Sequence, residues 1–102
     1  MANSFKSYQV TGVTTEQTVF TGASGTQTTI IGMTICNTGS VSMYTSIKLN
    51  SAYLAKDIPV AVGSTFIPIG GDQKVVIETG DTVKVSCSSS SADVIMSTLE
   101  IA

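Results

Sequence analysis

The sequence predicts an all-β fold, an antiparallel β-sandwich of immunoglobulin-like or jelly-roll kind with about seven to nine short strands. Three observations lead to this prediction. The apolar segments are short and many alternate with polar residues. They end at glycines or serines, at roughly the eight-to-twelve-residue spacing of sandwiches and barrels. No segment carries the apolar stripe of an amphipathic helix. A small closed barrel is the alternative architecture.

The N-terminal part opens a single domain that spans residues 1–102, because 102 residues is a common size for one hydrophobic core. Residues 1–16 have weak periodicity, and apolar points at Phe5 and Tyr8 favour either a first edge strand or an arm that docks on a neighbour. Residues 17–21 (QTVFT) predict a short strand. The turn at 22–25 follows, where two glycines permit the positive φ that such a connection often needs.

The middle of the chain predicts two strands with different surroundings. Residues 26–37 carry apolar or small side chains on both faces, which is typical of a central strand covered on both sides. After a turn at 37–40, residues 41–49 alternate between apolar and polar, which predicts a half-buried strand with a wet outer face.

The remaining residues predict edge positions and a closing strand. Residues 53–54 form only a short apolar point. Proline cannot donate to a ladder, so Pro59 places its segment at a sheet edge or a strand start, and Pro68 marks another edge-like segment. Residues 74–78 and 82–87 predict strands that are joined by a tight hairpin at 79–81. The serine run at 88–91 predicts a solvated hairpin loop before a long final strand, 92–101, that is apolar on both faces.

The composition indicates a protein that works within an assembly. Charged residues make up 12% of the chain and the net charge is −2, while serine and threonine fill more than a quarter of the positions. Few charges give weak self-repulsion, and a monomeric sandwich exposes unpaired sheet edges. The alternative is an ordinary monomer with hydroxyl-rich faces.

The sequence carries no pattern of catalytic, cofactor-binding or metal-binding residues, so we expect a protein that is not an enzyme and needs no cofactor. Histidine is absent, which leaves the many serines without the usual activating base. Glu78 and Asp81 flank one turn, where a calcium ion would need several more oxygen ligands, so a polar turn is the simpler interpretation. Asp93 and Glu100 are expected to face water.

Several partners and compartments are also disfavoured. The five lysines are dispersed and arginine is absent, so direct nucleic-acid binding is not expected. No apolar run is long enough to span a membrane and the N-terminus has no signal-like apolar region, which favours synthesis in a cytoplasm. Cys36 and Cys87 could bridge two sheets as in immunoglobulin domains. Without the tryptophan that packs on such a bridge, buried free thiols are the preferred interpretation.

Carbohydrate or receptor binding remains as an alternative function. Small β-sandwiches often stack sugars on exposed aromatic rings, and Tyr8, Tyr44 and Tyr53 are the three tyrosines of the chain. Packing in the core or at an interface explains these side chains equally well.

One resemblance covers most of the chain. The motifs that carry it are Ile58-Pro59, Gly63, Gly70-Gly71, Lys74 to Ile77, Gly80-Asp81, Ser86 to Ser91 and the closing Leu99-Glu100-Ile101, with TTEQTVFTG near the start. Together they resemble small structural proteins of tailed bacteriophages, notably those of cyanophages. These motifs are also generic turn chemistry.

The resemblance implies a non-enzymatic virion protein, made in the host cytoplasm and found in the virion. It implies a capsid decoration or cement protein that binds the major capsid protein and forms a homo-oligomer, with a trimer expected by analogy. A neck, tail or baseplate component is the alternative within this class. The expected interface residues are Phe5, Tyr8 and Tyr53.

Overall fold

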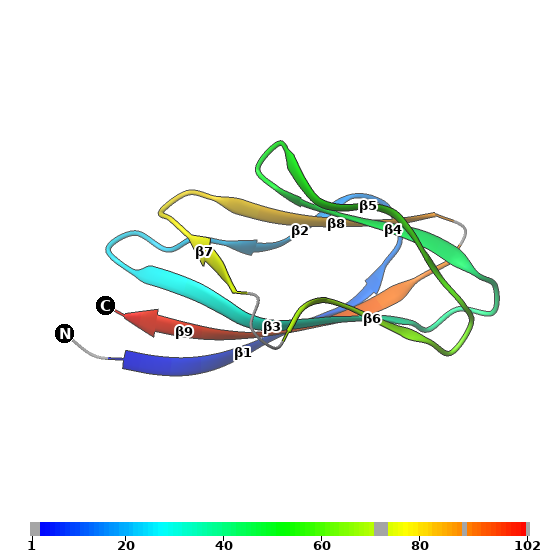
Figure 1. Cartoon of the computed structure of the whole chain (residues 1–102), viewed down its shortest axis with the longest axis horizontal. Coiled ribbons are helices and arrows are strands. Elements are labelled where there is room, and N and C mark those ends of the chain that lie inside the picture. Colours follow the sequence, from blue (N-terminus) through cyan, green and yellow to red (C-terminus); the bar gives the residue numbers. More distant parts are fainter. Residues whose placement is uncertain (1–2, 71–73, 89, 102) are drawn as a thin grey trace.

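The computed structural model describes residues 3–70, 74–88 and 90–101, and shows two antiparallel sheets packed face to face (Figure 1). The first sheet contains β1 (Asn3–Val13), β9 (Ala92–Ile101), β3 (Gln27–Asn37) and β6 (Thr65–Ile69) in this order, and β7 (Val75–Ile77) also pairs with β3. The second sheet contains β2 (Gln17–Thr21), β8 (Thr82–Ser88), β4 (Met43–Leu49) and β5 (Ala52–Val60). The predicted all-β antiparallel sandwich is confirmed.

The strand pairing is nested, which makes the fold a jelly roll. β1 pairs with β9, β2 with β8, β3 with β6 and β4 with β5, as in one long antiparallel ribbon. Rolling this ribbon adds the β9–β3 and β8–β4 pairs and produces the two sheets. An immunoglobulin domain distributes its strands differently between the sheets, so the structure decides between the two predicted forms.

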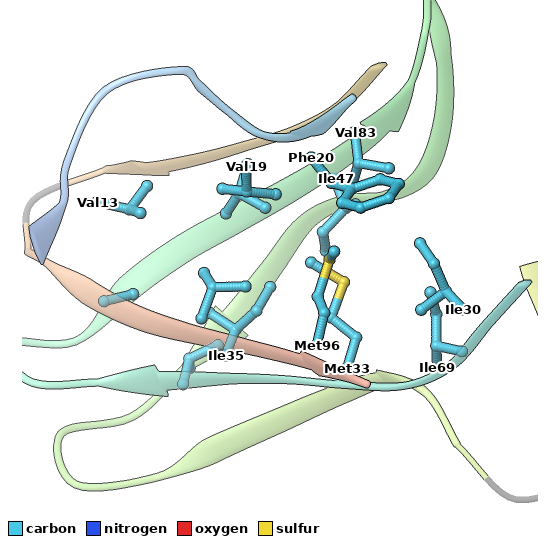
Figure 2. Close-up of a cluster of buried hydrophobic side chains, with 14 of the residues drawn as sticks. Val13, Val19, Phe20, Ile30, Met33, Ile35, Ile47, Ile69, Val83 and Met96 are labelled. Carbon is cyan, nitrogen blue, oxygen red and sulfur yellow. The ribbon is translucent and has the colours of Figure 1, made fainter. Parts of the chain in front are cut away.

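The hydrophobic core lies between the two sheets and is built by alternating residues of the central strands (Figure 2). On β3 the inward side chains are Ile30, Met33 and Ile35, and each is almost completely buried. Met96 of β9, in the same sheet, and Ile47 of β4, in the opposite sheet, belong to the same core. Each such side chain contributes about 1.5–3 kcal/mol relative to an exposed position, so these alternating positions hold the sheets together.

The predicted hairpin at 79–81 is wrong, because its two strands belong to different sheets. β7 lies beside β3 in the first sheet, whereas β8 lies between β2 and β4 in the second. The turn itself is present: the Asp81 N–H donates to the Glu78 carbonyl at 3.0 Å, and Gly80 adopts φ +84°. The same turn residues can close a hairpin or a corner between sheets, so local sequence does not distinguish them.

The serine run also crosses between sheets, and is not the predicted hairpin loop. It connects β8 of the second sheet to β9 of the first, and Ser90 donates to the Asn37 side-chain oxygen at 2.9 Å. Ser89 lies outside the described residues, as do Gly71 and Asp72.

Several other strand predictions agree with the structure. β2 and β9 coincide with the predicted ranges 17–21 and 92–101. The strands that contain Pro59 and Pro68, β5 and β6, lie at sheet edges as expected. However, β5 is a strand of nine residues where the sequence predicted a short apolar point. β3 is central, but its outward face is only half-buried.

Candidate interaction surface

The outer face of the first sheet is rich in exposed apolar side chains. In β9 the residues at 92, 94, 96, 98 and 100 are buried, so the alternate positions point away from the second sheet. The register places Phe5 beside Leu99, Leu99 beside Thr29 and Thr29 beside Val76, in one row across four strands. Phe5 is 77% exposed and Val76 is 65% exposed. This row therefore forms an apolar strip across the sheet.

A second apolar row lies further along the same strands. Ile95 of β9 is paired with Thr34 of β3, and Ile67 of β6 lies on the far side of β3. Ile95 is 49% exposed and Ile67 is 61% exposed. The two rows are about 14 Å apart, from four residues at about 3.4 Å each. We call these two rows together the apolar face: Phe5, Leu99, Thr29, Val76, Ile95, Thr34 and Ile67.

The apolar face carries no charge between its two ends. From the Asn3–Ile101 pair to the Gln9–Ile95 pair, the outward positions described for β1, β9, β3 and β7 hold only apolar, hydroxyl, amide or glycine residues. Exposed apolar side chains grouped without charges are typical of the buried centre of a protein–protein interface.

The outer face of the second sheet is different, because it holds lysines and acidic residues. Lys48 and Lys84 are cross-strand neighbours, and Lys48 forms an ion pair with Glu16 at 3.3 Å. The ammonium groups of Lys48 and Lys56 each lie 5.2 Å from the centre of the Tyr53 ring. The molecule thus presents one apolar face and one charged face on opposite sides.

The three predicted interface residues do not come together. Phe5 lies on the apolar face, and half-exposed Tyr53 lies on β5 in the opposite sheet. Tyr8 points between the sheets, where its ring packs edge-on against Phe20 with centres 5.0 Å apart. The structure therefore places Tyr8 at the margin of the core and not on an outer surface. Residues 3–13 form an edge strand and not a detached arm.

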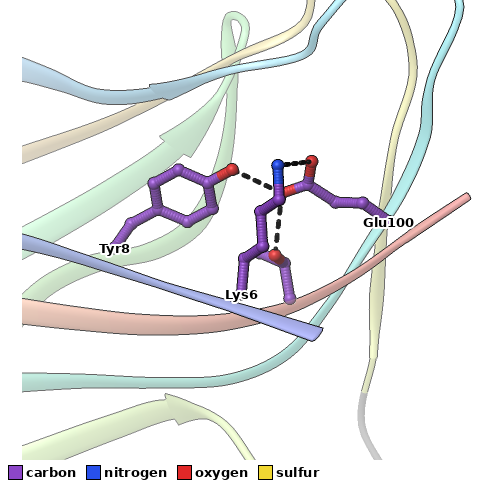
Figure 3. Close-up of polar contacts among 4 residues, drawn as sticks. Lys6, Tyr8 and Glu100 are labelled. Carbon is purple, nitrogen blue, oxygen red and sulfur yellow. Dashed lines mark hydrogen bonds and ion pairs between the residues drawn. The ribbon is translucent and has the colours of Figure 1, made fainter. Parts of the chain in front are cut away.

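Glu100 is the main polar feature that the sequence interpretation missed, since it was expected to face water. Its side chain points between the sheets, and the residue is 7% exposed (Figure 3). The Tyr8 hydroxyl and the Thr98 hydroxyl both donate to one carboxylate oxygen, the latter at 3.0 Å. The Lys6 ammonium lies 3.7 Å from the other oxygen. The alternation of Val94, Met96, Thr98 and Glu100 was the signal that could have placed it inward.

These contacts set the ionisation of both partners. Burial by itself would raise the pKa of the Glu100 carboxyl, but the hydrogen bonds from Tyr8 and Thr98 and the charge of Lys6 outweigh burial and hold that pKa below its usual range. The hydrogen bond to Glu100, followed by burial, raises the pKa of Tyr8 to about 12. Glu100 is therefore a buried carboxylate that ties β1 to β9 from the inside.

The tyrosines do not form a common sugar-binding platform. Tyr44 and Tyr53 are exposed on the second sheet, where Tyr44 pairs with Pro59 and Tyr53 pairs with Lys48. Residues 44 and 48 are four positions apart on β4, which corresponds to about 14 Å. Because Tyr8 lies between the sheets, a ligand cannot stack on all three rings at once.

The structure also places the remaining chemically capable groups. Within residues 3–70, 74–88 and 90–101, no group of three or more cysteine or carboxylate side chains is arranged to hold a metal ion. No helix long and apolar enough to cross a membrane occurs in the part of the chain that the structure describes. The polar turn predicted at Asp81 is present: hydrogen bonds from Asn50 and from the Glu78 N–H lower the pKa of its carboxyl.

The two cysteines are free and lie on opposite sides of the first sheet. Cys36 occupies an outward position of β3, and Cys87 of β8 packs against the core from the second sheet. Burial raises the pKa of the Cys87 thiol, which a contact with Thr45 partly offsets. The expectation of two free thiols agrees with this arrangement, but Cys36 is half-exposed and not buried.

Comparison with known proteins identifies a fold and no family. No protein-family model and no curated protein matches the chain. A solved structure described as "Bacillus endospore appendages form a novel family of disulfide-linked pili" is similar over 97% of this chain and 84% of the other, with a TM-score of 0.53 and 13% sequence identity. At this identity the likeness shows a shared fold alone.

Proposed function

We propose that this protein is a non-enzymatic structural subunit that packs against other proteins in a large assembly, as a capsid decoration or cement protein of a tailed bacteriophage. The observation that carries the proposal is the uncharged apolar face of the first sheet. A surface of this kind gains free energy when another protein covers it, and it needs no catalytic group. The partner proposed from the phage resemblance is the major capsid protein, with a neck, tail or baseplate position as the alternative site in the virion.

The asymmetry of the two outer faces supports a subunit with a fixed orientation. The apolar face is suited to contact protein, and the lysines and carboxylates of the second sheet are suited to contact water. A decoration protein has the same requirement, because one side binds the shell and the other side faces solvent.

The experiment that tests the virion assignment is a copy-number measurement. Quantitative mass spectrometry of purified particles would compare this protein with the major capsid protein. Hundreds of copies in a simple ratio to the shell subunit are expected for a decoration protein, and about a dozen would move it to the neck or tail. Absence from the particles would overturn the virion assignment.

A second experiment tests the apolar face itself. Val76→Lys adds a charge to the apolar face, at the β7 end of the row that begins with Phe5. Val62→Lys adds the same charge at a half-exposed valine between β5 and β6, outside that face. We expect Val76→Lys to reduce incorporation into particles at least tenfold, because a buried unpaired ammonium is costly. Val62→Lys should be incorporated normally. Equal incorporation of both variants would remove the apolar face from the interface.

A second candidate function is that of a subunit of an extracellular fibre. The observation that favours it is the shared fold with a protein whose description names disulfide-linked pili, together with the outward position of Cys36. Under this proposal the purified protein would form filaments visible by electron microscopy, and a Cys36–Cys36 disulfide between neighbouring subunits would give a covalent dimer on non-reducing gels. Cys36→Ser should abolish the covalent dimer; if wild-type protein forms neither filaments nor covalent dimers under oxidising conditions, this candidate fails.

A further inference from the structure

The two sheets have four lateral edges, and three of them are protected against pairing with another strand. β6 and β7 are five and three residues long, and β6 contains Pro68. β2 has five residues and a register shift between Thr18 and Phe20. β5 contains Pro59, the charged pair Lys56 and Asp57, and a positive φ of 51° at Asp57. Short strands, prolines, charges and bulges are the usual devices that block edge-to-edge association.

The fourth edge, β1, has one charged residue and, between Asn3 and Val10, none of the other devices. It is eleven residues long, contains no proline, and pairs with β9 in unbroken register from Asn3 to Val10. Among the described strands it has a partner on this one side, so the N–H and C=O groups on its other side face outward. Its single charged residue, Lys6, directs its ammonium to Glu100 on the inner side of the sheet.

We propose that β1 pairs with β1 of a second copy, antiparallel and across a two-fold axis at Ser7, so that the first sheets of two molecules become one continuous sheet. The occupant is a second copy because the open edge is self-complementary: an antiparallel pair of identical strands satisfies both sets of backbone groups with one isologous contact. A three-fold ring would need β1 to pair with a different edge, and each of those is protected.

The register follows from the faces and charges of β1. Directly paired residues point to the same side of a sheet. A two-fold axis perpendicular to the sheet must therefore pair one residue of β1 with the same residue of the second copy, and cannot lie between two consecutive residues. An axis at Lys6 would place two lysines opposite each other, which is unfavourable. An axis at Tyr8 would use the irregular residues beyond Val10, where Gly12 has φ +67°.

An axis at Ser7 avoids both problems. It pairs Phe5 with Gln9 of the second copy and Lys6 with Tyr8 of the second copy, within the regular part of the strand. Phe5 has Leu99 beside it on one side and none of the described strands on the other, so it gains a neighbouring strand. The apolar faces of both molecules then lie on the same side of the joined sheet. This arrangement does not depend on which larger assembly the dimer enters.

The pairing is tested with the purified full chain by engineered cross-linking. Residues paired at a two-fold axis have Cα atoms about 4.5–5.5 Å apart, which is within the range that a disulfide spans. Ser7→Cys in a Cys36→Ser background should therefore give a covalent dimer on oxidation, at micromolar protein. Ser97→Cys is the matched control, because Ser97 is also exposed and pairs with Ser7 on the neighbouring strand. Cross-linking of Ser7→Cys no greater than that of Ser97→Cys would overturn the proposal.

A charge pair gives a second, independent measurement by light scattering after gel filtration. Wild-type protein should have the mass of a dimer, Ser7→Lys should dissociate at least tenfold more readily, and Ser97→Lys should not. Mixing Ser7→Lys with Ser7→Asp should restore a dimer that neither variant forms alone. A wild-type monomer or trimer would contradict the proposal, and so would equal dissociation of both lysine variants. None of these results depends on particle incorporation, so the dimer and the virion assignment can fail separately.

Discussion

The hydroxyl of Tyr8 donates a hydrogen bond to the buried carboxylate of Glu100, and this contact joins the first strand to the last across 92 positions of the sequence. Thr98 donates to the same carboxylate oxygen at 3.0 Å, and Lys6 approaches the other at 3.7 Å. Two of the four groups come from β1 and two from β9. The cluster therefore holds β1 to β9 on the inner face of the first sheet, and β1 is the strand whose other lateral edge is open among the described strands.

The first prediction concerns the pH dependence of this cluster. The folded-state pKa of Glu100 lies below its ordinary value of 4.5, so the ionised carboxylate stabilises the fold at pH values above 4.5. That stabilisation is lost as the pH falls through the folded-state pKa. Glu100→Gln should remove this part of the acid sensitivity and lower the free energy of unfolding at pH 7 by about 1–3 kcal/mol. Urea unfolding between pH 3 and pH 8 provides the measurement.

Tyr8→Phe provides the control, because it removes one hydrogen bond and keeps the ring against Phe20. It should cost about 1–2 kcal/mol at pH 7, as for a hydrogen bond to a charged group. The Tyr8 pKa is shifted upwards, so its effect on stability has the opposite pH dependence. The stabilisation from the protonated Tyr8 hydroxyl is complete below pH 10 and is lost as the pH rises towards 12. An unchanged acid profile in Glu100→Gln would show that other carboxylates control acid unfolding.

The second prediction concerns Asn37, a buried side chain at the opposite end of the sandwich. Its amide nitrogen donates to the carbonyls of Val41 and Val60 at 2.9 and 3.1 Å, and its oxygen accepts from the Gly39 N–H and the Ser90 hydroxyl. Asn37→Ala leaves the buried Val60 carbonyl and the partly buried Val41 carbonyl without this donor and should lower the free energy of unfolding by about 2–3 kcal/mol. Denaturant titration measures this, with exposed Gln17→Ala as a control expected to stay within about 0.5 kcal/mol.

The third prediction concerns Gly22, where β2 ends beside the turn that crosses between the sheets. Its N–H donates to the Asp81 carbonyl at 2.9 Å, and its carbonyl accepts from the Gly80 N–H at 3.1 Å. A Cβ at this position would lie 2.1 Å from the Glu78 carbonyl oxygen, which is a backbone atom that cannot rotate away. Gly22→Ala should lower the free energy of unfolding by at least about 2 kcal/mol. Thermal melting checks this; a melting temperature as high as that of Ser24→Ala would contradict the close contact.

The fourth prediction compares the two cysteines. Burial raises the Cys87 pKa and its side chain packs against the core, whereas Cys36 faces outward from β3. Because the thiolate is the reactive form, an aromatic disulfide reagent at pH 7.5 should modify Cys36 at least tenfold faster than Cys87. The fast phase should disappear in Cys36→Ser and remain in Cys87→Ala. A fast phase that survives in Cys36→Ser would show that the core opens near Cys87.

The sequence predicted the fold class because glycines and alternating apolar residues mark strands independently of their partners. The ranges 17–21 and 92–101 were predicted correctly for this reason. The hairpin at 79–81 was wrong because a turn between paired strands and a corner between sheets use the same residues. β5 was largely missed since its alternation is weak and charges interrupt it.

The candidate surface was predictable only in part. Phe5 was identified because it is apolar outside a clear pattern, but the row that joins it to Leu99, Thr29 and Val76 depends on the register of four strands. That register brings together residues from both ends and the middle of the chain. Glu100 was missed because a carboxylate on a strand is usually solvated, and two of the three groups that stabilise its buried charge, Tyr8 and Lys6, come from β1.

The nested pairing has a consequence for the order in which the protein forms. β9 is synthesised after all the other described strands, yet it lies between β1 and β3 in the middle of the first sheet. Until residues 92–101 leave the ribosome, β1 lacks the one described strand with which it pairs, and one flank of β3 stays open. The first sheet is thus completed after translation of every other described strand, and closing such long-range contacts is a slow step in folding.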